Sequence, residues 1–129
     1  MRATLEKVLS TWPPGVRPKI HFSTPRSEMR EQERQDPKSR RKRTVYLAPV
    51  WTGHADFCNP FEFATFMRTM QGLEFDVMLE SKAKDLALIR LRPDLLRYAP
   101  DVAPRFGIAR ESLANEEQSL IEELAAGLE

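Results

Sequence analysis

A capped helix followed closely by an apolar strand is the feature that most constrains the fold of this chain. Asn59 can cap the helix, Pro60 suits its first turn, and Gly72 is typical of its end. The apolar stripe has helical spacing and consists of Phe63, Phe66, Met67 and Met70. The segment FDVMLES at 75–81 then reads as a strand, and its nearly continuous apolar character predicts a parallel strand covered on both faces.

Elements of alternating type surround this unit. The apolar spacing of 3–12 predicts a helix, and KIHFS at 19–23 is a strand candidate bounded by prolines. A further helix is expected over 83–100, interrupted or restarted at Pro93. Its inward-facing residues are expected to be Leu86, Ile89 and Leu91. Alternating strands and helices predict an α/β fold with a parallel sheet, whose functional groups gather at the carboxyl ends of strands.

Two charged segments fall outside this alternation. Residues 24–53 read as a long connection, basic at first with SRRKR at 39–43, and only 45–50 indicates a third strand. Beyond Arg110 every charged residue is a glutamate, which predicts an acidic amphipathic helix in the tail. The net charge is only +1, so a nucleic-acid partner is indicated by the distribution of the charges rather than by their sum.

Composition restricts the class of protein. A chain of 129 residues with 41% hydrophobic content is in the range of one domain. Its single cysteine, Cys58, excludes an intramolecular disulfide, follows no nucleophile pattern and is interpreted as structural. No apolar run reaches membrane-spanning length, so we expect a cytoplasmic protein without a membrane partner.

Two histidines and a glutamate fall at or just beyond predicted strand ends. His21, His54 and Glu80 together suit Mn²⁺, Zn²⁺ or Fe²⁺, although each histidine alone is more simply a hydrogen-bonded structural residue. A carboxylate that ends an apolar strand must be paired, metal-bound or protonated. Asp56 follows His54 by two positions and either orients that imidazole or forms an Asx turn before the helix cap.

Basic and hydroxyl side chains accompany these residues. Lys19 shares a strand face with His21, and a lysine beside metal ligands is repulsive unless it is neutralised, moved aside or modified. Lys82 and Lys84 open a predicted helix, where the helix dipole disfavours cations, so a phosphate partner competes with the simpler interpretation of solvated lysines. Further candidates for phosphate contact are Ser23, Thr24 and Arg26.

Three motifs in order, KIHFSTPR, HADFCNPFEF and FDVMLESKAKDLALIRLR, resemble the C-terminal part of the UV damage endonuclease family over roughly 5–107. The resemblance implies a TIM (β/α)₈ barrel. A complete barrel needs about 250 residues, so an incomplete barrel is expected here. We therefore divide the chain into 1–107, the C-terminal β/α units with a long basic loop at 27–53, and 108–129, an acidic helical tail.

The resemblance also implies a function in DNA excision repair. Family members cut double-stranded DNA 5′ to UV lesions with divalent metal ions, typically Mn²⁺. For this chain Mn²⁺ is therefore the expected ion, with Zn²⁺ or Mg²⁺ as alternatives. By this resemblance the metal ligands would be His21, His54 and Glu80. Lys19 corresponds to a lysine that can be carboxylated, and it would be catalytic together with Glu80. The residues that would position the DNA backbone are Ser23, Arg26, Lys82 and Lys84.

A chain with so few strands is expected to be inactive alone, with the remaining barrel strands supplied by a separate chain or by a longer gene product. Two alternatives stay open. One is a non-catalytic α/β module that binds nucleic acid through its basic segment. The other is a barrel related to metal-dependent sugar isomerases, which fits histidine and glutamate at strand ends but not the basic loop.

Overall fold

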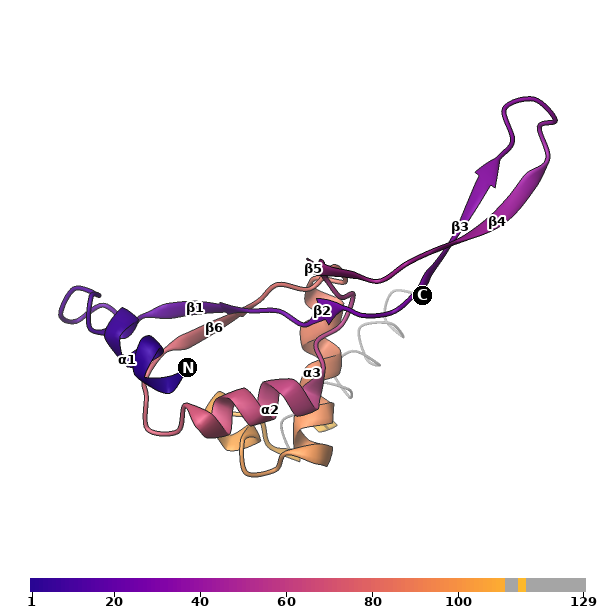
Figure 1. Cartoon of the computed structure of the whole chain (residues 1–129). Helices are drawn as coiled ribbons and strands as arrows, with labels where there is room; N and C mark the ends of the chain where they lie inside the picture. Colours follow the sequence, from indigo (N-terminus) through magenta and orange to yellow (C-terminus); the bar gives the residue numbers. More distant parts are fainter. Residues whose placement is uncertain (111–113, 116–129) are drawn as a thin grey trace, which may run out of the picture.

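The computed structural model describes residues 1–110 and 114–115, which form helices and short strands (Figure 1). The expected acidic helix lies almost entirely outside these residues. The elements are α1 (Arg2–Leu9), β1 (Lys19–Phe22), β2 (Pro25–Arg26), β3 (Arg30–Gln35), β4 (Lys42–Leu47), β5 (Val50–His54), α2 (Pro60–Thr69), β6 (Asp76–Leu79), α3 (Asp85–Tyr98) and a 3-10 turn, η1 (Ala103–Phe106).

The strands β1 and β6 pair in parallel, as the alternation of elements predicts. The register runs from Lys19 opposite Asp76 to Phe22 opposite Leu79. Residues of β1 alternate between exposed and half-buried, so Lys19 and His21 share the outer face. Within the described residues neither strand has a second neighbour, and the outer edges of this small sheet are unpaired. The α/β class with parallel strands is thus confirmed.

The helix α2 forms where the capping signal predicts it. Asn59 lies in extended backbone, and its side-chain oxygen accepts hydrogen bonds from the backbone N–H groups of Phe61 (3.0 Å) and Glu62 (3.3 Å). Phe63 and Met67 are buried against the sheet and α3. The ring of Phe22 on β1 meets the ring of Phe63 edge to face at 5.1 Å between centroids. The helix therefore covers the inner face of the β1–β6 pair.

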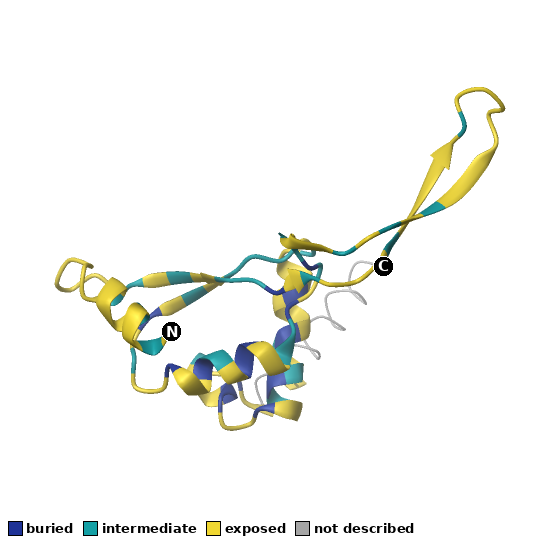
Figure 2. Ribbon diagram, viewed as in Figure 1, coloured by how far each residue is buried: buried dark blue, intermediate teal, exposed yellow. Residues whose placement is uncertain are grey.

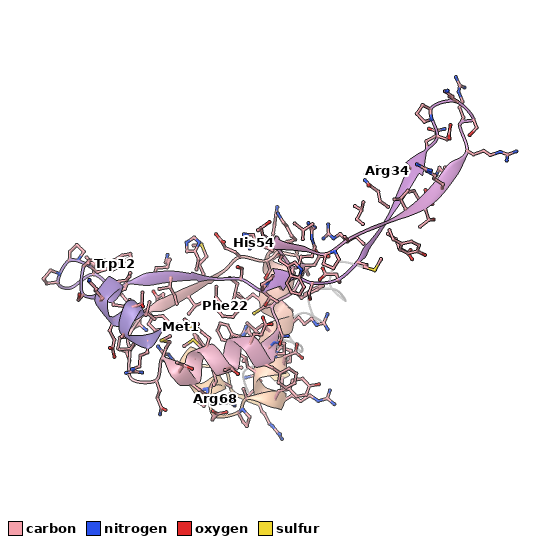
Figure 3. All side chains as sticks on the ribbon, viewed as in Figure 1. Met1, Trp12, Phe22, Arg34, His54 and Arg68 are labelled. Carbon is pink, nitrogen blue, oxygen red and sulfur yellow. The ribbon has the colours of Figure 1, made fainter. Side chains whose placement is uncertain are left out.

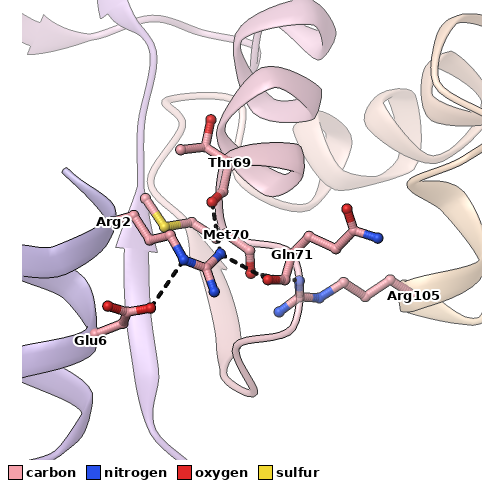
Figure 4. Close-up of polar contacts among 6 residues, drawn as sticks. All are labelled: Arg2, Glu6, Thr69, Met70, Gln71 and Arg105. Carbon is pink, nitrogen blue, oxygen red and sulfur yellow. Dashed lines mark hydrogen bonds and ion pairs between the residues drawn. The ribbon is translucent and has the colours of Figure 1, made fainter.

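The core lies between this sheet, α2 and α3, and Figure 2 shows its buried residues in dark blue. Its largest fully buried side chains are Met70, Phe75 and Leu95. The opening helix α1 joins the core through half-buried leucines and through Arg2, whose Nη1 donates to the carbonyls of Thr69 (3.0 Å) and Gln71 (2.8 Å) (Figure 4). A cation at these carbonyls also complements the C-terminal end of the α2 dipole.

The orientation predicted for α3 is wrong at two of three positions. Leu86 and Ile89 are 59% and 60% exposed, and only Leu91 is buried as predicted. The helix buries positions four apart, beginning with the small residue Ala87, and the prediction overlooked this residue in favour of larger ones. The helix also continues through Pro93 without interruption. Proline has no backbone N–H, so the carbonyl of Ile89, four residues earlier, receives no helical hydrogen bond. Ile89 lies on the exposed face of α3.

The prediction of a strand covered on both faces is also wrong for β6. Its residues alternate between exposed and half-buried, and Met78 is 44% exposed. The face of the sheet that carries Met78, Lys19 and His21 has no covering element in the described part of the chain.

Among the helices of the described residues, none is both long enough and apolar enough to cross a membrane.

Residues 24–53 form four strands rather than the predicted long connection. The strands β3 and β4 pair antiparallel over six residues each, and β2 pairs antiparallel with β5 across an irregular register. The third strand predicted at 45–50 is divided between β4 and β5, and neither joins the parallel sheet. Asp36 stabilises the β3–β4 turn by accepting hydrogen bonds from the backbone of Lys38 (2.8 Å) and Ser39 (2.9 Å).

Candidate functional site

Glu80 follows β6 directly and is held by the parallel sheet. Its backbone N–H donates to the carbonyl of Phe22 at 2.8 Å, which extends the β1–β6 ladder by one step. This bond places the Glu80 side chain beside His21, on the outer face of the same sheet. The carboxyl ends of two parallel strands therefore present an imidazole and a carboxylate together, as the fold class predicts.

The Glu80 carboxylate lies between the two histidines. Its Oε1 is 2.6 Å from Nδ1 of His21, and its Oε2 is 3.3 Å from Nε2 of His54, the last residue of β5. Figure 3 shows His54 at the junction between the packed elements and the projecting strands. Three segments far apart in the sequence thus meet at one carboxylate, and the predicted set of His21, His54 and Glu80 is brought together.

Hydrogen bonding favours the ionised form of Glu80. The hydrogen bond from His21 lowers the pKa of the Glu80 carboxyl below its ordinary value of 4.5, and the charges of His21 and His54 act in the same direction. Desolvation opposes this shift. The site therefore holds an anion at neutral pH.

The donor types of this cluster fit a divalent metal ion, because two imidazoles and a carboxylate suit Mn²⁺ or Zn²⁺. The hydrogen bond from His21 engages its Nδ1, the close contact of His54 engages its Nε2, and the other nitrogen of each ring lies outside these contacts. Across residues 1–110 and 114–115, no three His, Cys, Asp or Glu side chains are arranged to hold a metal ion. The residue types of the cluster thus suit a metal ion but their present arrangement does not form a ligand set, and the role of the three residues as metal ligands stays a prediction.

Lys19 lies on the same exposed face as His21, two residues earlier on β1. Alternate residues of a strand are about 6.5–7 Å apart, so Lys19 borders the cluster without belonging to its hydrogen bonds. This position agrees with the predicted shared face. Carboxylation of Lys19 stays a prediction.

Asp56 has a different partner from the one that its position in the sequence suggests. Its Oδ1 accepts a hydrogen bond from Nη2 of Arg30 at 2.6 Å, and its backbone carbonyl accepts from the N–H of Ala83 at 3.0 Å. Asp56 therefore links the base of β3 to the start of α3 two residues beyond His54. Sequence reasoning missed Arg30, because nothing local distinguishes it within the basic run of 26–43.

The candidate phosphate ligands divide into two groups. Arg26 lies over β5, where its Nη2 would be 3.2 Å from a Cβ added to Gly53, the residue before His54. Thr24 is buried instead, and its hydroxyl accepts a hydrogen bond from the backbone of Asn59 at 2.9 Å. Thr24 is therefore a structural residue, contrary to the expectation of a phosphate contact. Ser23 is half-buried at the end of β1.

The two lysines after Glu80 remain accessible. Lys82 is exposed, and its backbone N–H donates to Ala55 at 3.0 Å, which places it beside the segment that follows His54. Lys84 is exposed at the N-cap of α3 with a φ of 54°, a conformation that a non-glycine residue adopts at some cost. Cys58 is buried, and burial raises the pKa of its thiol to about 11, which agrees with a structural role.

Comparison with known proteins assigns the chain to a family. The family model described as UV-endonuclease UvdE matches residues 1–105. A relative, the UV DNA damage endonuclease of Bacillus cereus (strain G9842), is 34% identical over 92 residues, which are 70% of this chain and 23% of the relative. The chain thus spans about a quarter of the length of that relative. No solved structure matches the chain. With its cluster of His21, His54 and Glu80 inside the matched range, the chain belongs to the UvdE family of UV-endonucleases.

Proposed function

We propose that this chain carries part of the metal centre of an endonuclease that cuts DNA 5′ to UV lesions during excision repair. The observation that supports this most is the Glu80 carboxylate between His21 and His54, at 2.6 Å and 3.3 Å. All three residues lie within the segment that the family model matches. An anion shared by two imidazoles at strand ends is a suitable precursor of a divalent-metal site.

His21, His54 and Glu80 would hold the ion, which we expect to be Mn²⁺, with Zn²⁺ or Mg²⁺ as alternatives. When bound, such an ion activates water and neutralises the charge of a phosphodiester. A carboxylated Lys19 would add an anion on the same face of β1. The chain would position the DNA backbone through four residues that are exposed or half-buried, namely Ser23, Arg26, Lys82 and Lys84.

We further propose that β1 and β6 are neighbouring strands of an incomplete TIM barrel. Their outer edges are unpaired in the described residues, and Met78 on the outer face is 44% exposed. Both features suit additional strands from a partner chain or from the remainder of a longer protein. The chain alone should therefore be inactive, because three donors and a lysine make at most a loose site for one ion.

Titration calorimetry with Mn²⁺ tests the centre without requiring catalysis. The wild-type chain should bind Mn²⁺, and Glu80→Gln and His21→Ala should each abolish the binding heat. Glu74→Gln is the matched control, because Glu74 is exposed and pairs with Arg17 away from the cluster. Absence of Mn²⁺ binding, or equal binding by Glu80→Gln and Glu74→Gln, would contradict the proposal.

A nicking assay tests the inactivity of the isolated chain. We expect no lesion-dependent nicking of UV-irradiated supercoiled plasmid by the 129-residue chain in the presence of Mn²⁺. Robust nicking that disappears in Glu80→Gln would show that the chain is sufficient for catalysis.

A second candidate function is a non-catalytic module that binds nucleic acid. The exposed, basic β3–β4 hairpin favours it, because the hairpin would bind phosphate whether or not the chain cuts DNA. DNA binding without Mn²⁺ binding would support this alternative over the endonuclease.

A further inference from the structure

The β3–β4 hairpin concentrates positive charge. Residues 30–47 contain seven Lys or Arg and three Asp or Glu, a net charge of +4, whereas the net charge of the whole chain is +1. The hairpin projects away from the packed elements (Figure 1), and none of its residues is buried. Its side chains are therefore available to a partner rather than to a core.

The pairing register sorts these charges onto two faces. Directly paired residues of an antiparallel ladder lie on the same face, and alternate pairs lie on opposite faces. One face carries both strand glutamates, Glu31 and Glu33, together with Lys42, which pairs with Glu33 at 3.2 Å. The opposite face, which we call the arginine face, carries no acidic residue. It consists of Arg30, Gln32, Arg34, Arg43, Val45 and Leu47.

Two arginines of this face oppose each other without an anion. Arg34 is the direct cross-strand partner of Arg43, and like charges in that position destabilise a hairpin. The Nε of Arg34 donates to Gln32 at 3.1 Å, and neither guanidinium has an acidic partner in the described residues. Figure 3 shows Arg34 on the projecting hairpin. An anion from outside these residues would relieve the repulsion between the two arginines.

The turn adds cations beyond this pair. The Asp36 carboxylate is bound to the backbone of Lys38 and Ser39, and these hydrogen bonds lower its pKa. The carboxylate thus holds the turn in shape. The exposed side chains of Lys38, Arg40 and Arg41 have no ion pair with another described residue. The tip of the hairpin therefore continues the positive surface of the arginine face.

We propose that the arginine face of the β3–β4 hairpin binds the phosphate backbone of duplex DNA. A two-stranded ribbon fits the width of the DNA major groove, where phosphates flank both sides. The Arg30–Asp56 hydrogen bond fastens the base of the hairpin two residues from His54, so bound DNA would extend toward Glu80. The choice of DNA over another polyanion rests on the proposed function. The exposed Tyr46 lies on the opposite face, so the arginine face lacks the exposed bulky apolar residues that binding to a lipid surface requires.

The affinity of the full chain for a short, undamaged, fluorescein-labelled duplex tests the proposal when measured by anisotropy over a range of salt concentrations. Each lost phosphate contact should lower the salt slope by about 0.9, so Arg34→Gln/Arg43→Gln should lower it by about 2 and weaken binding at low salt by about tenfold or more. The control variant, Lys7→Gln/Arg97→Gln, loses the same charge from exposed positions on α1 and α3 and should retain the wild-type slope.

A third variant separates loss of binding from loss of structure. Arg43→Glu places a carboxylate opposite Arg34, which should stabilise the hairpin while abolishing DNA binding. Three results would each overturn the proposal: no binding of the duplex by the wild type at low salt, equal slopes for the hairpin and control variants, or binding to phosphatidylserine vesicles that duplex DNA cannot compete away. The hairpin variants should bind Mn²⁺ as the wild type does. Failure of the metal centre therefore shows in the Mn²⁺ titration, and failure of the hairpin proposal shows in the DNA titration.

Discussion

The packed region of β1, β6, α2 and α3 and the β3–β4 hairpin are stabilised by different interactions. Buried aromatic and aliphatic side chains such as Phe75 and Leu95 hold the packed region together. The hairpin has a backbone ladder, one internal ion pair between Glu33 and Lys42, the Arg30–Asp56 ion pair at its base and no buried residue. The cluster around Glu80 lies where the two regions meet. Most of the buried contacts therefore lie in the packed region, whereas the hairpin contributes an exposed concentration of positive charge, and each should be alterable without the other.

The largest difference between the two regions should appear when a buried side chain is truncated. Phe75 is 2% exposed, lies 6.4 Å from the ring of Phe66 between centroids and is covered by the Arg105 guanidinium. Phe75→Ala should lower the free energy of unfolding by about 3–5 kcal/mol in urea denaturation. Val45→Ala in the half-buried part of the hairpin should cost about 1 kcal/mol or less. Equal losses would show that the hairpin contributes to a common core.

Removing the α2 cap should have a smaller effect. Asn59→Ala leaves the N–H groups of Phe61 and Glu62 without their acceptor and should cost about 1 kcal/mol. Asn59→Ser is the control, since serine caps a helix about as well, and it should retain most of the stability. The same urea denaturation measures both variants, and equal losses would argue against a capping role.

Acid titration compares one carboxylate from each region. In the packed region, two hydrogen bonds from the Arg68 guanidinium, both 2.7 Å, lower the pKa of Asp101 below its ordinary value of 3.8. In the hairpin, hydrogen bonds from the backbone N–H groups of Ser39 and Lys38 lower the pKa of Asp36. Each carboxylate contributes stability above the unfolded pKa and loses it as the pH falls through the lower folded value. In carboxyl-carbon NMR titrations, Arg68→Gln should raise the pKa of Asp101 and leave that of Asp36 unchanged. A shift of both would show that the two regions are coupled.

Local signals in the sequence predicted the packed region well. The cap at Asn59, the apolar stripe of α2 and the alternation along β1 depend on residues close in sequence, and the structure confirms each. The inward face of α3 was mispredicted, because the exposed Leu86 and Ile89 are more hydrophobic than the buried Ala87. Burial there depends on neighbours distant in the chain, and helical spacing alone did not reveal them.

The hairpin and part of the site could not be predicted from local patterns. A two-stranded ribbon without a buried face lacks the apolar alternation that identifies strands, so 24–53 read as a connection. The meeting of His21 and Glu80 was predictable from their positions at strand ends, because parallel pairing brings such ends together. The approach of His54 does not follow from that rule, because β5 lies outside the parallel sheet. The bond between Arg30 and Asp56 was not predictable either, since it depends on where the hairpin leaves the packed region.

Pulsed electron paramagnetic resonance of Mn²⁺ bound to the full chain tests the central claim most directly. If His21, His54 and Glu80 share the ion, the spectrum should show nitrogen modulation from imidazole. His21→Ala and His54→Ala should each reduce the modulation, and Glu80→Gln should weaken the binding of the ion. A spectrum that matches the aqueous ion, or nitrogen modulation that persists unchanged in both histidine variants, would contradict the claim.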